Sequence, residues 1–449
     1  MATPAPNQAN PAPSAPGVHP KPLWSFKPRS DREAGDAVVS NFMLHWFPAK
    51  VFKPSLDWSY SFWLGTISAA LFLLLVVSGL PLLFLYVPSV ERAYGSVKDI
   101  EWVVTFGSWI RSVHRLSAHL MVAAVFLHLV RVFLTGAYKN GAGRGQKREW
   151  NWVIGVAMLL LTLFLSFTGY LLPWDQLAFW AVTVGTNIAA SIPWIGPQLR
   201  ELLIGGRNID QPTLIRFYAL HVILLPAALG ALFAYHMWRV RKDGGLARAD
   251  GVASLREKAA DEPVRTKTYS LLGVARGTAP AIRTASIEAR ELTVNAVPDL
   301  VRRASVAVLG TFAVISVLAS LVRSPLEEPA NPLVTPNPAK APWYFLWLQE
   351  IVTDTTFTAF GFTVNGAFLG GVILPGLLIG LLTAWPWLDR SHGEAAGAWF
   401  HGSRRTQNAV FLLVVLVIVA LTVVGTFLRG PSWQFFWPWQ AWPELPTRI

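Results

Sequence analysis

The 449-residue sequence contains no cysteine. This absence excludes a disulfide scaffold, a zinc or iron–sulfur site with cysteine ligands, and a haem attached through a thioether bond. Charged residues are also scarce: they make up 14% of the chain, whereas a soluble domain carries roughly 25%. With hydrophobic residues at 53%, the chain lacks the polar surface that a water-soluble protein needs. The composition therefore indicates a membrane protein whose main solvent is lipid.

Seven apolar runs are long enough to cross ~30 Å of hydrocarbon, which takes about 20 residues of helix. We expect an all-α transmembrane fold with spans at residues 62–87, 113–138, 152–172, 213–238, 304–323, 366–386 and 408–428. The Pro/Ala-rich start of the chain lacks the apolar core of a signal peptide, so we expect it to be disordered. Residues 36–55 are expected to form a short interfacial helix.

The net charge of +12 is distributed unevenly over the loops. Nearly all of the excess lysine and arginine falls on the N-terminal segment and on the loops at 139–151, 239–303 and 387–407, which seven spans place on one side. Positively charged loops stay in the cytoplasm, so we expect a cytoplasmic N-terminus. Nucleic-acid binding is not expected, because no basic stripe with interleaved aromatic residues occurs.

Five of the nine histidines lie inside the expected spans, where an ionisable residue is energetically expensive and indicates function. His114 and His128 are 14 residues apart, which corresponds to ~21 Å along a helix and to directions that differ by only ~40°. His221 and His236 are 15 residues apart and about 60° from alignment. One such histidine could be a packing residue, but two matched pairs can clamp two planar macrocycles through neutral imidazole nitrogens. His119 points to a different face, so we expect it to be a packing or supporting residue.

Glycines repeat the histidine interval in the neighbouring spans. Gly65 and Gly79 are 14 residues apart, and so are Gly155 and Gly169. Glycine lets a flat ligand or another helix approach the backbone closely, so one pair alone would fit ordinary helix packing. Two pairs at the histidine interval favour a bundle that holds two haems. Arginines near the histidines would pair with haem propionates, and the candidates are Arg111, Arg115, Arg131, Arg216 and Arg239.

The sequence resembles the cytochrome b subunit of quinol–cytochrome c oxidoreductases over about residues 36–245 and 300–430. The motifs that carry the resemblance are RSVHR at 111–115, GYLLPWDQLAFWAVTVGTN at 169–187, TLIRFYALH at 213–221, EEPANP at 327–332 and PWYF at 342–345. The histidine interval of 15 is similar to that of the plastoquinol–plastocyanin type. In that type the four-helix and three-helix parts are separate subunits, whereas here they look fused.

We divide the chain into five parts on this basis. They are a disordered N-terminus (1–35), a dihaem four-helix domain (36–245), a cytoplasmic connector (246–302), a three-helix domain with an outer quinol-site loop (303–430), and a Trp-rich tail at the outer interface (431–449). The resemblance also implies a multi-pass protein of the bacterial inner membrane. Its expected partners are a Rieske-type iron–sulfur protein and a c-type cytochrome, in a homodimeric complex.

The resemblance implies two b-type haems, both held without a covalent bond. The ligands of the outer haem would be His114 and His221, and those of the inner haem His128 and His236. Quinol would be oxidised in an outer pocket, where the expected residues are Tyr170, Pro342, Trp343 and Tyr344. Quinone would be reduced near the inner haem, next to the basic pair Arg241 and Lys242.

The chain departs from the family pattern at two places. The family motif is commonly Pro-Glu-Trp-Tyr, but residues 341–344 are Ala-Pro-Trp-Tyr, so the usual proton acceptor for quinol is missing. A base must lie within hydrogen-bond reach of the bound head group. Glu350 is the candidate replacement and Asp354 the second, although both could be solvated loop acids. Plant-type relatives attach a third haem to a cysteine at the position of Trp63, so we predict two haems.

These features predict the membrane subunit of a quinol–cytochrome c oxidoreductase. It would oxidise quinol outside, pass electrons through two haems to a quinone inside, and couple this transfer to proton translocation. One alternative is a dihaem membrane anchor that connects another dehydrogenase or reductase to the quinone pool without bifurcation. A second alternative is a transporter with intramembrane histidines, which would bind no haem.

Overall fold

The computed structural model describes residues 50–140, 147–243, 293–391 and 396–443, together with residues 34 and 245. Within these ranges, seven helices are long and apolar enough to cross a membrane: Leu64–Leu85, Gly107–Leu134, Arg148–Leu171, Gln211–Lys242, Ala296–Leu321, Gly366–Leu388 and Gly402–Leu428. The seven predicted spans and the all-α transmembrane fold are confirmed. Several helices begin earlier than predicted, because polar turns continue the helix beyond its apolar core.

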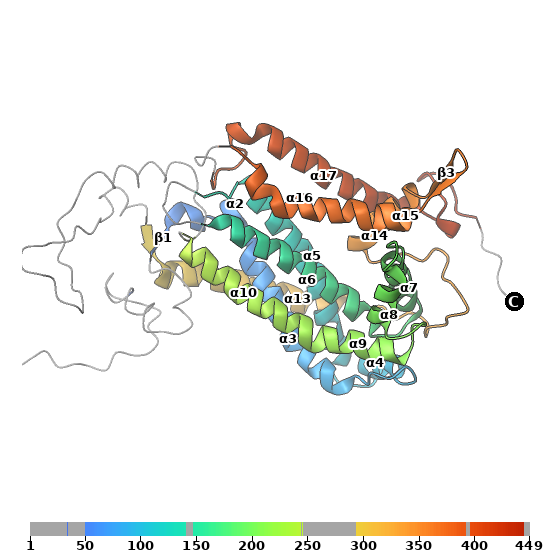
Figure 1. Ribbon diagram of the computed structural model, residues 1–449. Helices are drawn as coiled ribbons and strands as arrows, with labels where there is room; N and C mark the ends of the chain where they lie inside the picture. The colour runs from blue at the N-terminus through green and yellow to red at the C-terminus, as the bar shows by residue number, and fades with distance from the viewer. Residues whose placement is uncertain are drawn as a thin grey trace, which may run out of the picture.

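The first four spans form one unit. They are α3 (Leu64–Leu85), α5 (Gly107–Leu134), α6 (Arg148–Leu171), and a composite helix of α9 (Gln211–Ala219), the π-helical turn η3 (Leu220–Leu224) and α10 (Leu225–Lys242). The shorter helices are α2 (Trp58–Ser61), α4 (Ala93–Trp102), α7 (Gln176–Ala190) and α8 (Gly196–Ile204). Figure 1 shows α4, α7, α8 and α9 gathered at one end of the bundle, here called the α7 end. The opposite end, which carries β1, is called the β1 end.

The last three spans form the second unit. They are η4 (Ala296–Leu300) with α13 (Val301–Leu321), then α15 (Gly366–Phe368) with η5 (Leu369–Ile373) and α16 (Leu374–Leu388), and finally η7 (Gly402–Arg404) with α17 (Arg405–Val423) and η8 (Val424–Leu428). At the α7 end lie α14 (Trp343–Asp354), a hairpin of β3 (Phe357–Ala359) and β4 (Phe362–Val364), and η9 (Pro431–Trp433). The two units are packed together, since α13 contacts α3 and α5 while α16 contacts α6.

Proline explains two of the π-helical turns. Pro226 follows η3, and Pro375 follows η5. Because proline has no N–H, it cannot bond to the carbonyl four residues earlier, and the helix widens locally to accommodate the free carbonyl. His221 lies in the first of these turns, so the widened backbone sets the position of its imidazole.

The segment before the first span differs from the prediction. Residues 50–55 do not continue an interfacial helix: Lys50–Phe52 form strand β1, and Lys53–Leu56 form the 3₁₀ helix η2. β1 pairs antiparallel with β2 (Thr293–Asn295), just before the fifth span. A partner strand far away in the sequence satisfies the backbone here, which local helix propensity could not indicate. Outside the described residues lie 36–49, all of the expected disordered start except residue 34, and most of the connector 246–302.

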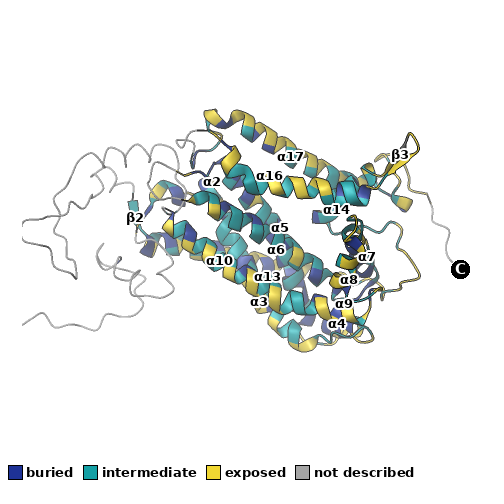
Figure 2. Cartoon of the chain, viewed as in Figure 1, coloured by how far each residue is buried: buried dark blue, intermediate teal, exposed yellow. Residues whose placement is uncertain are grey.

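The surface of the spans is apolar, as a lipid environment requires. Phe84, Leu321 and Phe427 are all largely exposed on spans, and Figure 2 shows exposed residues along the outer faces of α10, α16 and α17. Several charged side chains are buried, and most of these form ion pairs: Arg111 with Glu101, Arg239 with Asp243, and Arg404 with Asp389.

Candidate functional site

His114 and His128 on α5 both face glycines of α3. A Cβ atom on Gly79 would lie 3.3 Å from Cε1 of His114, and a Cβ atom on Gly65 would lie 3.1 Å from Cε1 of His128. Carbon atoms in favourable contact are about 3.5–4.0 Å apart, so any side chain at either position would press on an imidazole ring. The intervals in α3 and α5 match because each glycine makes room for one ring.

The same relation holds between α6 and the composite helix. A Cβ atom on Gly169 would overlap the ring of His221, whereas one on Gly155 would lie 4.0 Å from Cε1 of His236. The sequence predicted the common interval, and the structure adds which glycine faces which histidine. All four predicted ligand positions are therefore paired with the four predicted glycines.

His114 and His221 form a couple near the α7 end. Their ring centroids are 6.2 Å apart and their planes are inclined by 74°. Nδ1 of His221 lies 3.0 Å from the carbonyl oxygen of Leu165, which can only accept a hydrogen bond. Nδ1 of His114 lies 3.0 Å from Oγ of Ser78, whose hydroxyl already donates to the carbonyl of Leu74.

Both hydrogen bonds fix the same tautomer in this couple. Because each Nδ1 must donate, the lone pair of each ring is on Nε2, and this is the nitrogen left to coordinate a metal. A hydrogen-bond acceptor next to the other ring nitrogen is the usual arrangement for a histidine that binds a metal. The couple therefore presents two imidazole nitrogens that would be able to hold a haem iron.

His128 and His236 lie further along α5 and α10, towards the β1 end. Nδ1 of His236 is buried, and the backbone of Asn151 is the polar group that interacts with this ring. Arg131 is also buried, with its guanidinium 4.7 Å from the ring centroid of Tyr60 and with no carboxylate partner in the described ranges. A buried cation of this kind fits a propionate, so these residues are also compatible with a haem.

A cavity of about 370 Å³ opens beside the first couple. It lies between α3, α4, α5, α6 and α9, and it is closed on one side by residues of the second unit, so we call it the α7-end cavity. His114 and His221 line it, together with titratable groups from both units, which are Tyr86, Arg111, Arg115, His119, Tyr170, Asp175, Tyr218, Glu327 and Tyr344. A ligand here would therefore contact the histidine couple and both units of the protein.

The motif at 342–345 reaches the cavity through Tyr344. The Tyr344 ring lies 5.8 Å from that of His119, and both residues line the cavity. Trp343 does not line it but donates a hydrogen bond from Nε1 to Nδ1 of His119, over 3.2 Å. Pro342 is the N-cap residue of α14 and also lies outside the lining. His119, expected to be a packing or supporting residue, thus belongs to the cavity wall, a position that its helical direction alone did not indicate.

Asp175 and Glu327 bring two loops together at the cavity. Asp175 caps α7, since its Oδ1 accepts from the backbone N–H of Ala178 at 2.9 Å, while its Oδ2 accepts from the N–H of Glu327 at 3.4 Å. The backbone N–H of Gln176 also donates to the carbonyl of Glu328. Neither acid was singled out from the sequence. The sequence did contain a signal for the position of Asp175, because an aspartate immediately before a helix is a typical N-cap.

Glu350, the predicted base, is placed elsewhere. Its side chain is buried and accepts hydrogen bonds from Nε of Arg429, at 2.8 and 3.2 Å. Arg429 also contacts the carboxylate of Asp354 at 3.2 Å. Neither acid is among the residues that line the α7-end cavity. The assignment of Glu350 as a base stays a prediction, and its carboxylate is already paired with a guanidinium.

The predicted arginines separate into groups. Arg111 and Arg115 line the α7-end cavity and donate to the carbonyl of Pro325, and Arg111 also pairs with Glu101 at 2.8 Å. Arg216 is exposed and bonds to the carbonyl of Leu202 outside the cavity lining. Near the β1 end, the residues with their own contacts are Arg239, which pairs with Asp243, and Lys242, whose Nζ lies 4.6 Å from the ring of Trp238. Arg241 also has an interaction partner.

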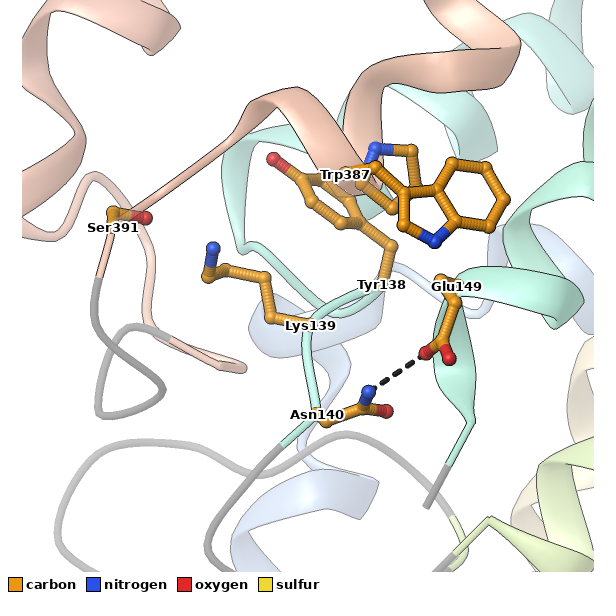
Figure 3. A pocket seen from close by; sticks show the side chains of 7 residues that line it. Tyr138, Lys139, Asn140, Glu149, Trp387 and Ser391 are labelled. Atoms are coloured by element: carbon orange, nitrogen blue, oxygen red, sulfur yellow. Dashed lines mark hydrogen bonds between the residues drawn. The ribbon is translucent and has the colours of Figure 1, made fainter.

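A second cavity, of about 270 Å³, lies at the β1 end between the two units. Figure 3 shows Tyr138, Lys139 and Glu149 from the first unit facing Trp387 and Ser391 from the second, with a hydrogen bond of 2.7 Å from Asn140 to Glu149. It is more open and smaller than the α7-end cavity, and none of the predicted site residues line it.

A buried charge cluster lies beside this second cavity and joins the two units. Asp389 accepts from the Tyr138 hydroxyl at 2.7 Å and from Nε of Arg404 at 3.1 Å, while Lys139 lies 3.3 Å away. Burial alone would raise the pKa of Asp389, but hydrogen bonds from Ser391 and Tyr138 outweigh burial and hold that pKa well below its usual range. The four side chains of Asp389, Tyr138, Arg404 and Lys139, here called the Asp389 cluster, therefore connect the segments that follow α5 and α16 with the segment that begins α17.

Comparisons with known proteins agree with this arrangement. Residues 50–244 match the family model "Cytochrome b/b6/petB", and residues 329–438 match "Cytochrome b(C-terminal)/b6/petD". Cytochrome b6 of Prochlorococcus marinus (strain AS9601) is 44% identical over 181 residues, which are 40% of this chain and 80% of that protein. Cytochrome b6 of Synechococcus sp. (strain CC9311) is 41% identical over 198 residues, covering 44% of this chain and 87% of the relative.

The fold is also shared with a solved structure. A chain of "Hyperthermophilic respiratory Complex III" superposes with a TM-score of 0.61 at 24% identity, covering 84% of this chain and 86% of that one. The two family models fall on the two helical units that pack against each other in this structure. The chain therefore belongs to the cytochrome b/b6 family, as a fused cytochrome b in which the four-helix and the three-helix parts are one polypeptide.

Proposed function

We propose that this chain is the dihaem subunit of a quinol:cytochrome c oxidoreductase, or of a complex with a similar acceptor. The observation that carries the proposal is the position of the histidine couple. His114 and His221 line the same cavity as Tyr170 and Tyr344, which come from different units. An electron donor bound in this cavity would contact its first electron acceptor directly, without an intervening protein layer.

His114 and His221 would hold one b-type haem through Nε2, and His128 and His236 would hold the other. Gly79, Gly169, Gly65 and Gly155 give each ring the space to turn towards such a ligand. Haems bound at these positions would supply one-electron transfer across the membrane. Arg131 would neutralise a propionate of the haem held by His128 and His236.

The α7-end cavity would bind quinol at the outer face. The cavity measures about 370 Å³ and is also lined by Gly79, Gly169, His114 and His221, so the haem that this couple would hold would share the cavity with the quinol. Its wall combines apolar side chains with the polar groups of His119, Tyr170, Asp175 and Tyr344, as a quinol head group requires. A quinone would be reduced near the β1 end, where Arg241 and Lys242 would stabilise negative charge.

The chain would work within a larger complex. A Rieske-type iron–sulfur protein would take one electron of each quinol and pass it to a c-type cytochrome, and the complex would be a homodimer. The second electron would cross the membrane, so that protons leave at the α7 end and enter at the β1 end. We place the protein in the inner membrane of a bacterium, with its N-terminus in the cytoplasm.

The test uses the complex purified from membranes. We expect a reduced-minus-oxidised spectrum with two b-type components, quinol-dependent reduction of a c-type cytochrome, and a co-purified iron–sulfur protein. His114→Ala and His128→Ala should each remove one b-type component and leave the other. Two haems without cytochrome reduction and without an iron–sulfur partner would instead support a simple dihaem anchor. No b-type absorption would refute the proposal.

A further inference from the structure

The wall of the α7-end cavity contains several titratable groups near the proposed quinol site. Most of them cannot accept a proton from quinol, because they are already protonated or because their lone pair accepts another hydrogen bond. Nδ1 of His119 accepts the indole hydrogen of Trp343, so its other nitrogen carries a hydrogen and acts as a donor. Burial raises the pKa of Tyr344 to about 12, and the hydroxyl of Tyr170 is likewise protonated near neutral pH, so both are poor proton acceptors. Arg111 and Arg115 are cations.

Two carboxylates remain, and their exposure differs. Asp175 is 7% exposed and lines the cavity at the start of α7, whereas Glu327 lines the same cavity and is exposed. The backbone N–H of Glu327 donates to Oδ2 of Asp175, so the two residues are adjacent. Of the two, Asp175 is the buried group and Glu327 the one exposed at the surface.

Resting on the quinol site proposed above, we propose that Asp175 accepts the proton of the bound quinol and that Glu327 relays it to the outer face. The O–H bond of one quinol hydroxyl breaks, and a new O–H bond forms on the Asp175 carboxylate. The quinolate that is left gives one electron to each of the two one-electron acceptors of the complex and, once the Asp175 carboxylate has been regenerated, a second proton along the same route, which yields quinone. Glu327 takes the proton from Asp175 and releases it to water, which regenerates the carboxylate.

The surroundings of Asp175 suit this role. Burial raises the pKa of Asp175 above its usual range, and this effect outweighs the two backbone N–H donors and the arginines, which lower it. A base works best when its pKa approaches the working pH. The charged and titratable groups that face Asp175 are Arg111 and Arg115 from α5, Tyr170 from α6, Tyr94 from α4, and Glu327 and Glu328 from the loop.

The decisive variant is Asp175→Asn in the intact purified complex. Asparagine is as good an N-cap as aspartate, so α7 keeps its first hydrogen bond while the proton acceptor is lost. We expect kcat for quinol oxidation to fall about 10²–10⁴-fold, the usual contribution of a general base, with a smaller change in KM. The acid limb of the pH profile should disappear, while both b-type absorption components stay.

Controls separate this inference from the proposed function. Asp210→Asn makes the same change at the N-cap of α9, outside the cavity lining, and should leave turnover within about twofold of the wild type. Asp175→Glu should restore turnover with a shifted acid limb, which covers the case in which Asp175→Asn fails to assemble. If Asp175→Asn or Asp175→Glu turns over with the wild-type acid limb, the inference is wrong although quinol oxidation stands. If the wild-type complex oxidises no quinol, the proposed function itself fails.

Discussion

Trp343 and His119 come from different units and are joined by one hydrogen bond, in which the indole Nε1 donates to Nδ1 of the imidazole over 3.2 Å. The residue before this tryptophan is Pro342, at the position where the family motif commonly has its glutamate. The contact therefore fixes the tautomer of a histidine on the cavity wall close to the missing carboxylate. Its Nε2–H is a donor that can hold a quinol or quinone oxygen.

Removing this hydrogen bond should weaken quinol binding. In Trp343→Phe the ring is kept but the donor is lost, so His119 can change tautomer and stop donating to the head group. A net hydrogen bond is worth about 1 kcal/mol, so we expect KM for quinol to rise roughly fivefold with a smaller change in kcat. Trp387→Phe at the β1 end is the matched control and should leave KM unchanged. An unchanged KM in Trp343→Phe would contradict the positioning role.

Two glycines of α6 should respond differently to the same substitution. A Cβ on Gly169 would overlap the His221 ring, whereas a Cβ on Gly155 meets nothing closer than 4.0 Å. We therefore expect Gly169→Ala to lose or broaden one b-type absorption component and Gly155→Ala to retain both. The measurement is haem content per protein together with the reduced-minus-oxidised spectrum. Equal haem content in both variants would show that the space facing His221 is not required.

Substitution of Glu350 should have a different effect from substitution of Asp175. Because Glu350 is paired with Arg429, we expect Glu350→Gln to lower the Tm of the complex and to keep the acid limb of quinol oxidation. Asp354→Asn removes the more exposed partner of the same arginine and should have a smaller effect on Tm. Thermal unfolding gives the Tm, and steady-state rates measured over a range of pH give the acid limb. Loss of turnover in Glu350→Gln with an unchanged Tm would return the role of proton acceptor to Glu350.

The Asp389 cluster at the β1 end should contribute strongly to the stability of the folded protein. Removing one partner of a buried ion pair costs about 3–5 kcal/mol, because the other charge stays buried, so Asp389→Asn should lower Tm clearly. Glu91→Gln, at an exposed position, is the control and should have no measurable effect.

The Asp389 cluster should also make the stability of the protein depend on pH. The pKa of Asp389 is lowered in the folded protein, so its stabilising effect is complete above the unfolded pKa of about 3.9 and is lost as pH falls further. Unfolding curves recorded at successively lower pH should show wild type and Asp389→Asn converging in Tm. A constant difference in Tm over this range would rule out Asp389 as the titrating group.

The sequence by itself determined the seven spans and the four histidines with their glycines. A span is defined by the length of an apolar run against the thickness of hydrocarbon, and the spacing along one helix follows from its pitch. Both properties are local, so they can be read without knowing which helices are neighbours. For the same reason the family motifs of both units could be recognised from short stretches of sequence.

Only the tertiary structure decided which side chains meet. Three contacts join segments that are distant in the sequence. Glu350 pairs with Arg429, β1 pairs with β2, and Asp175 and His119 line one cavity. Such contacts depend on how each helix is rotated and packed against its neighbours. A shift of one residue turns a helix by about 100°, so spacing along the chain indicates which residues share a face but not what that face contacts.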